Sequence, residues 1–135
     1  MSSLNNLQVN TERRNEMIDI TARIRKLVED SQISEGSVEV FVPHTTAAVT
    51  INENADPAVR SDILQYLERL IPQKAGFRHA EGNSDAHIKA SLVGSSLSVF
   101  VSGGHLVLGT WQGIYFCEFD GPRSRKVIVK TISED

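Results

Sequence analysis

The nine residues from His79 to His87 carry the densest group of reactive side chains in the chain. They read His-Ala-Glu-Gly-Asn-Ser-Asp-Ala-His and hold two imidazoles and two carboxylates, those of Glu81 and Asp85. The Gly-Asn-Ser between them favours a turn, so groups at the two ends can approach one spot. Histidine and carboxylate together are ligands for zinc or partners in acid–base catalysis. A solvated polar loop is the alternative, because this spacing matches no standard zinc motif.

A third histidine, His44, lies in the sequence Pro43-His44-Thr45-Thr46, directly after a predicted strand. Pro43 has no amide hydrogen, so it interrupts strand pairing or lies at an edge or a bulge. Such breaks often direct a side chain into a site. His44 is therefore a candidate site residue, and a histidine hydrogen-bonded to the neighbouring hydroxyls is the alternative.

Other polar side chains extend the candidate site. Arg123 and Arg125 follow Gly121-Pro122, where their guanidinium groups either hold phosphate oxygens or are solvated on a turn. Trp111 is a candidate for ligand contact or for ordinary core, and Gln112 beside it needs a polar partner. The candidates for substrate binding are Asn52, Asn83, Ser95, Ser96, Trp111, Gln112 and Arg125.

Hydrophobic periodicity predicts the elements that position these residues. Two short strands over 4–10 and 15–20 are expected to form a hairpin, and further strands are expected over 37–42, 47–51, 97–101 and 126–132. Residues 105–119 are β-rich and follow a tight Gly103-Gly104 turn. Helices are expected over 21–31 with Thr21 as cap, over 57–71 after an Asp56 cap, and over 87–92 with Ser84 or Asp85 as cap. The second of these helices has an apolar face and is expected to serve packing.

Composition indicates one globular domain over residues 1–135. The chain has 40% hydrophobic residues and no apolar run of membrane-spanning length, and its first residues do not resemble a secretory signal. A net charge of −3 gives no general attraction for nucleic acid. Cys117 is the single cysteine, which excludes an internal disulfide and is typical of a buried thiol in a cytoplasmic protein.

Three sequence blocks occur in a fixed order along the chain. The first is His44-Thr45-Thr46-Ala47 with Asn52-Glu53-Asn54 and Asp56-Pro57, and the second is His79-Ala80-Glu81-Gly82-Asn83 with Ala86-His87-Ile88-Lys89 and Gly94-Ser95-Ser96. The third is Gly109-Thr110-Trp111-Gln112-Gly113-Ile114 with Glu118 through Arg123. Together they resemble the YjbQ-like family, described as secondary thiamine-phosphate synthases, over about residues 4–132.

The resemblance implies a compact α+β domain with a curved mixed sheet or sandwich and two or three helices, assembled as a homotrimer. It implies a weak transferase activity, a secondary thiamine-phosphate synthase that joins a pyrimidine pyrophosphate to a thiazole phosphate and releases pyrophosphate. The resemblance also implies a metal ion bound at a histidine cluster, as in some members of the family. The matching histidines here are His44, His79 and His87.

A mechanism follows from this resemblance. Three neutral imidazoles leave an open position on a zinc ion, and magnesium bound with a pyrophosphate substrate is the alternative metal. Glu53, Glu81 and Asp85 are candidates for orienting the imidazoles or moving protons, and Arg123 for stabilising charge on the leaving pyrophosphate. Two other functions remain open: a metal-dependent hydrolase of a small phosphorylated compound, and a non-enzymatic trimer that binds a metal or a small ligand.

Overall fold

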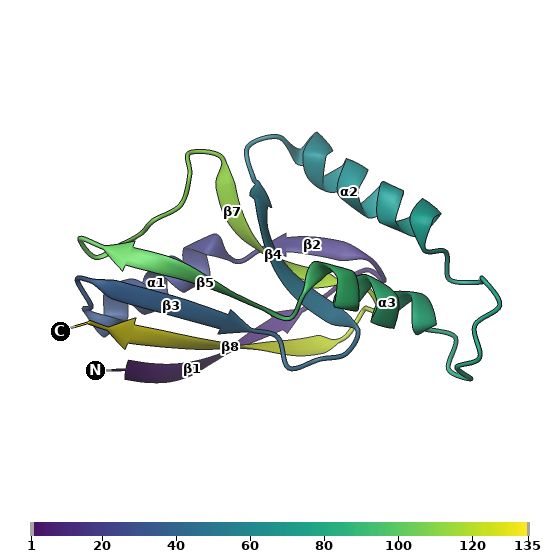
Figure 1. Ribbon diagram of the computed structural model, residues 1–135, viewed down its shortest axis with the longest axis horizontal. Helices are drawn as coiled ribbons and strands as arrows, with labels where there is room; N and C mark the ends of the chain where they lie inside the picture. Colours follow the sequence, from purple (N-terminus) through teal and green to yellow (C-terminus); the bar gives the residue numbers. More distant parts are fainter. Residues whose placement is uncertain (1, 135) are drawn as a thin grey trace.

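The computed structural model describes residues 2–134 and combines strands with helices (Figure 1). The elements are β1 (Ser2–Asn10), β2 (Glu16–Asp19), α1 (Thr21–Ser31), β3 (Gly36–Phe41), β4 (Ala47–Glu53), α2 (Pro57–Leu70), α3 (Ser84–Val93), β5 (Ser96–Ser102), β6 (His105–Leu106), β7 (Gln112–Glu118) and β8 (Ser124–Ser133). The predicted α+β class is confirmed, with three helices. The expected mixed sheet is wrong, because every strand pair in the described residues is antiparallel.

The strands form two sheets. The larger has five strands in the order β1-β8-β3-β5-β6, and the smaller has three in the order β2-β7-β4. The predicted hairpin between the first two strands is therefore wrong. Val9 in β1 faces Arg125 in β8, whereas Met17 in β2 faces Cys117 in β7. The two strands have good local β patterns, but their partners lie at the other end of the chain, and a local pattern does not specify distant partners.

The main core lies between the two sheets and includes one face of α1. Alternating valines of β3, β5 and β8 point inward, and Ile24 and Val28 of α1 meet them together with Ile114 and Phe116 of β7. The helix ends at Ser31 as predicted, but its expected Thr21 cap is wrong. The Thr21 amide donates to Asp19 Oδ1 at 2.9 Å, and the Thr21 hydroxyl accepts from the Ile114 amide at 2.8 Å. The threonine thus joins the helix start to β7.

The outer side of the smaller sheet is covered by α2 and α3 (Figure 1). β7 lies in the middle of this sheet and is buried on both faces, which explains its continuous apolar sequence. Cys117 is buried there as predicted, and burial raises the pKa of its thiol to about 12. No helix in residues 2–134 is long and apolar enough to cross a membrane.

The helices differ in how well sequence predicted them. Asp56 caps α2 by accepting from the Ala58 amide at 2.9 Å, as expected from Asp-Pro. α2 packs only loosely, however, since none of its residues is fully buried. α3 begins at Ser84, three residues before the predicted start, and neither expected cap is used because Asn83 holds the N-cap position. Its predicted end at Gly94 is confirmed.

Candidate functional site

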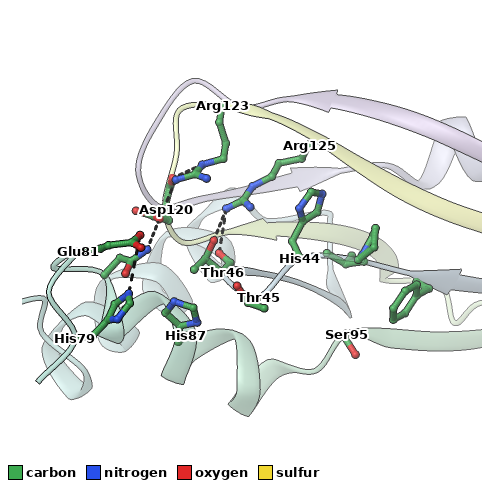
Figure 2. A pocket seen from close by; sticks show the side chains of 14 residues that line it. His44, Thr45, Thr46, His79, Glu81, His87, Ser95, Asp120, Arg123 and Arg125 are labelled. Atoms are coloured by element: carbon green, nitrogen blue, oxygen red, sulfur yellow. Dashed lines mark hydrogen bonds and ion pairs between the residues drawn. The ribbon is translucent and has the colours of Figure 1, made fainter. Parts of the chain in front are cut away.

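An open pocket of about 680 Å³ lies where β3, the loop after it, the loop before α3 and the start of β8 meet (Figure 2). Its lining is mostly polar. The residues are Phe41, Val42, Pro43, His44, Thr45, Thr46, His79, Glu81, Asn83, His87, Ser95, Asp120, Arg123 and Arg125. Of the predicted site residues, it brings together His44, His79, Glu81, Asn83, His87, Ser95, Arg123 and Arg125.

The break in strand pairing at Pro43 builds one wall of the pocket. β3 ends at Phe41, and the Val42 amide then donates to the Ser95 carbonyl at 2.8 Å. The chain leaves the large sheet over residues 43–46 and enters the small sheet at Ala47. His44, Thr45 and Thr46 lie on this crossing segment and point toward the pocket (Figure 2). The role predicted for the proline is thus borne out by the local backbone.

His44 is held in one neutral form. The Lys126 amide donates to His44 Nε2 at 3.0 Å, so that nitrogen carries no proton and the neutral ring is protonated on Nδ1. Partial burial, followed by the nearby Arg125 charge, lowers the pKa of His44 below its usual 6.5. Within residues 2–134, no group accepts from Nδ1, which leaves a donor for a ligand.

Arg125 forms the buried end of the pocket. It is only 4% exposed and forms an ion pair with Glu118, which is fully buried. Its Nε donates to Glu118 Oε1 at 2.9 Å, and its Nη2 donates to the Thr46 hydroxyl at 2.8 Å and to Glu118 Oε2. Burial alone would raise the pKa of Glu118, but hydrogen bonds from Arg125, the Asp120 amide and Thr11 outweigh it and lower that pKa. The guanidinium is therefore fixed in orientation.

Asp120 connects the turn before β8 to the start of α3. Its Oδ2 accepts from Asn83 Nδ2 at 2.8 Å and from Arg123 Nη2 at 2.9 Å, and its carbonyl accepts from Arg123 Nε at 2.9 Å (Figure 2). Gly121 follows, and a Cβ there would lie 2.3 Å from the Arg13 carbonyl oxygen. This turn accepts glycine alone without displacement of the backbone beside it.

His79 and His87 form a pair that does not include His44. Their rings meet edge to face with centroids 5.4 Å apart. His44 lies on the far side of the pocket, and its Nε2 is already occupied by the Lys126 amide (Figure 2). Within residues 2–134, no three His, Cys, Asp or Glu side chains are placed to hold one metal ion. The three imidazoles of a single chain therefore do not fit the expected zinc ion.

Comparison with known proteins identifies the family of this chain. The family model described as UPF0047 protein YjbQ-like matches residues 5–134. The chain belongs to this family. A UPF0047 protein of Methanocaldococcus jannaschii is 52% identical over 94% of this chain and 92% of its own length. The UPF0047 protein YugU of Bacillus subtilis is 50% identical over 94% of this chain and 97% of its own length.

Solved structures of the YjbQ-like family have the same fold. A crystal structure from Clostridium acetobutylicum is 54% identical, has a TM-score of 0.93 and covers 95% of this chain and 99% of that one. A YbjQ-like protein of Sulfolobus solfataricus is 34% identical, has a TM-score of 0.95 and covers 99% of each chain. The Sulfolobus protein is described as being of unknown function.

These findings correct the expected activity. The UPF0047 relatives carry no assigned reaction, and nothing in them points to thiamine-phosphate synthesis. The described residues also lack the three-ligand cluster on which the mechanism depended. The prediction of a metal-assisted thiamine-phosphate synthase is therefore wrong, and so are the metal-dependent alternatives built on the same three histidines. The identity of any divalent metal, zinc or magnesium, stays a prediction.

The remaining predicted residues do not line the pocket. Asn52 and Glu53 end β4, where they face Gly113 and Gln112 of β7, next to the exposed Trp111. β4 spans seven residues, so at about 3.3 Å per residue its two ends are about 20 Å apart. Ser96 is in β5 opposite Phe41 and does not line the pocket. Trp111 is 62% exposed and does not belong to the core.

Sequence reasoning missed Asp120, Thr46, Glu118 and Arg14 as parts of the site or its support. Asp85, predicted as a catalytic group, is fully buried and accepts from Arg14 and Lys89. A signal was present between Glu118 and Arg125, where two carboxylates are followed by two arginines within eight residues. Opposite charges gathered around a strand end predict ion pairs, although they do not say which pairs are buried.

Proposed function

We propose that the pocket binds a small phosphorylated compound through Arg123 and Arg125. One observation carries the proposal: each guanidinium is fixed by a carboxylate, yet its Nη1 donates to no partner among residues 2–134. A guanidinium held in this way presents N–H donors in a geometry that matches phosphate oxygens. Both arginines line the same pocket.

Neutral donors also line the pocket. Thr45 and Ser95 contribute hydroxyls to the lining, and His44 contributes its protonated Nδ1. Asp120, a carboxylate of the pocket lining, already accepts hydrogen bonds from Asn83 and Arg123, so much of its charge is compensated. The openness of the pocket to solvent and its polar lining favour a small, charged ligand over an apolar one.

Calorimetric titration tests this proposal with glycerol 3-phosphate, inorganic phosphate and glycerol as probes. We expect binding of the two phosphates and none of glycerol. Arg123→Gln is expected to weaken phosphate binding about tenfold or more, because a charge-assisted hydrogen bond contributes about 1.5–3 kcal/mol and 1.4 kcal/mol is tenfold. Arg25→Gln, which removes an exposed arginine of α1, is the matched control. Equal affinity of the parent and Arg123→Gln would reject the site.

A divalent metal ion is proposed only as one that binds together with the phosphorylated ligand. Mg²⁺ is commonly held by one or two carboxylates together with substrate phosphates. Glu81 lines the pocket and accepts no hydrogen bond within residues 2–134, so its carboxylate is available for that role. Titration of glycerol 3-phosphate with and without Mg²⁺, in the presence of chelator as baseline, measures the contribution. Identical affinities would remove the metal from the proposal.

We also propose that the chain forms the homotrimer implied by its sequence resemblance. The outward side of the large sheet carries Leu4, Phe41, Phe100 and Val107, which we call the outer face, and all four side chains are exposed. β1 is an edge of this sheet with nine residues and no charged side chain or proline. Long unprotected edges are usually paired or covered in native proteins. Because Phe41 also lines the pocket, subunits packed on this face would meet beside the site.

Light scattering with size-exclusion chromatography tests the assembly. The parent is expected to have the mass of a trimer at micromolar concentration, and Phe100→Asp is expected to shift it toward the monomer by placing a charge on the outer face. Glu29→Arg, a charge change on the exposed side of α1, is the control. A monomeric parent would reject the trimer while leaving the phosphate site open to its own test.

A further inference from the structure

A chain of ion pairs runs beneath the pocket from the buried side of α3 to Arg123. It starts at Lys89, which is 1% exposed, and Asp85, which is fully buried. Lys89 Nζ lies 3.1 Å from Asp85 Oδ2, and Arg14 approaches the same carboxylate with both terminal nitrogens at 2.9 and 3.0 Å. None of these three residues lines the pocket. Their arrangement needs an explanation other than direct ligand contact.

Arg14 lies between two carboxylates. Its Nη2 donates to Asp85 and is also 3.9 Å from Asp120 Oδ1. These partners raise the pKa of Arg14 and, in turn, Arg14 and Lys89 lower the pKa of Asp85 against the opposing effect of burial. Arginine suits this position because its planar fork holds one carboxylate with two parallel bonds while its charge acts on a second.

The main chain of Arg14 contacts the same turn as its side chain. The Gly121 amide donates to the Arg14 carbonyl at 3.1 Å, and Gly121 packs directly against the neighbouring Arg13 carbonyl. Asp120, adjacent to Gly121, in turn holds the Arg123 guanidinium through its carboxylate and its carbonyl. The turn is therefore fixed from one side by Arg14. Arg123 is in turn fixed by its hydrogen bonds to Asp120 (Figure 2).

α3 is attached to this turn through Arg14 and through Asn83. Asp85 is on α3, and Asn83 at the N-cap position donates to Asp120 Oδ2 at 2.8 Å. His87 is two residues after Asp85 on that helix. Arg14 therefore contacts both the helix that carries His87 and the turn that holds Arg123.

We propose that Arg14 is a positioning residue for the anion site: by binding Asp85 and Asp120 together, it fixes the Arg123 guanidinium toward the pocket. This rests on the phosphate site proposed above. Arg14 does not contact the ligand. Its effect on affinity is transmitted through Asp120 to Arg123, and the exposed neighbour Arg13 has no such effect.

A double-mutant cycle on glycerol 3-phosphate affinity tests the connection. Arg14→Gln is expected to weaken binding about tenfold in the parent and to have little further effect in the Arg123→Gln background, because non-additivity marks residues that act through one another. Arg14→Lys keeps the charge but loses the bidentate contact, so its affinity is expected to lie between those of the parent and Arg14→Gln. Arg13→Gln is the matched control and is expected to bind as the parent does. An equal loss from Arg14→Gln in both backgrounds would overturn the proposal.

A measurement on the ligand-free protein separates this proposal from the phosphate site. The Arg123 Nε–H donates to the Asp120 carbonyl, so its ¹H–¹⁵N resonance reports how firmly the guanidinium is held. Arg14→Lys and Arg14→Gln are expected to shift or broaden that resonance, and Arg13→Gln is expected to leave it unchanged. An unchanged resonance in Arg14→Gln would overturn the positioning role even if phosphate binds. A shifted resonance without any phosphate binding would retain the positioning role and reject the proposed ligand.

Discussion

Asp85 and Glu118 are two fully buried carboxylates that meet the same electrostatic requirement with different partners. Asp85 faces two cations, Arg14 and Lys89, whereas Glu118 faces Arg125 together with the Thr11 hydroxyl and the Asp120 amide. Each carboxyl has a lowered pKa despite its burial. Of the two regions, only that of Glu118 leaves an unused donor nitrogen at the pocket, Arg125 Nη1. A buried ion pair can thus contribute to a binding surface through a donor that has no partner within the protein.

The largest effect should come from removing the carboxylate charge at Glu118. Glu118→Gln leaves Arg125 buried without a counter-ion, and breaking such a pair costs about 3–5 kcal/mol. Asp85→Asn should cost less, because a lysine can lose its proton in a buried site while arginine stays charged, and because Arg14 retains 28% exposure. Urea unfolding at neutral pH measures both free energies. Equal losses, or a larger loss at Asp85, would contradict the comparison.

Acid should weaken both regions, but over neighbouring pH ranges. A carboxyl with a lowered pKa in the folded protein stabilises the fold above its unfolded pKa, because the unfolded chain takes up the proton first. That contribution is lost as pH falls from the unfolded values, 4.5 for Glu118 and 3.8 for Asp85, through the lower folded ones. Each group changes stability by at most about 1.4 kcal/mol per pH unit.

Urea unfolding between pH 6 and pH 3 checks this dependence. The parent is expected to lose stability steadily below about pH 4.5. Glu118→Gln and Asp85→Asn should each show a shallower decline, because each lacks one of the groups that take up protons on unfolding. A variant with the full decline of the parent would show that its carboxylate does not contribute to the acid response.

Local sequence patterns predicted most elements and some of their boundaries. Asp56-Pro57 marked the start of α2, Gly94 the end of α3, and Gly103-Gly104 the turn before β6, where both glycines have positive φ. Each depends on backbone preferences within a few residues. The pairing of β1 with β8 and of β2 with β7 was not predictable in this way, because contacts between residues so far apart in the sequence have no local signal.

The same limit applies to the site. Motif blocks named the pocket histidines and Arg123, but they grouped them with Asn52 and Trp111, which lie at the far end of the small sheet. Spacing alone also did not show that Lys126 occupies His44 Nε2, since that contact joins residues 82 positions apart. The sequence therefore predicted one metal cluster of three histidines, whereas the structure pairs His79 with His87 and holds His44 against Lys126.

The smallest expected effect concerns His44, the titrating group next to the Glu118 region. Burial and Arg125 lower its pKa below 6.5, so the unfolded chain binds a proton at a higher pH than the folded chain does. Between pH 6.5 and the lower folded value, stability should therefore fall as pH falls, by less than about 1.4 kcal/mol per pH unit. His44→Gln keeps an acceptor for the Lys126 amide but does not titrate, so its stability should fall less than that of the parent between pH 7 and pH 5.5. His105→Gln, which replaces an exposed histidine outside the pocket, is the matched control. Ring titrations by NMR measure the His44 pKa directly, and a value at or above that of a free imidazole would show that the histidine is not held neutral. The same NMR titration with saturating glycerol 3-phosphate tests whether His44 belongs to the phosphate site. If the Nδ1 donor reaches the bound phosphate, the His44 pKa should rise, because an anion favours the protonated ring. No change on saturation would remove His44 from the phosphate site.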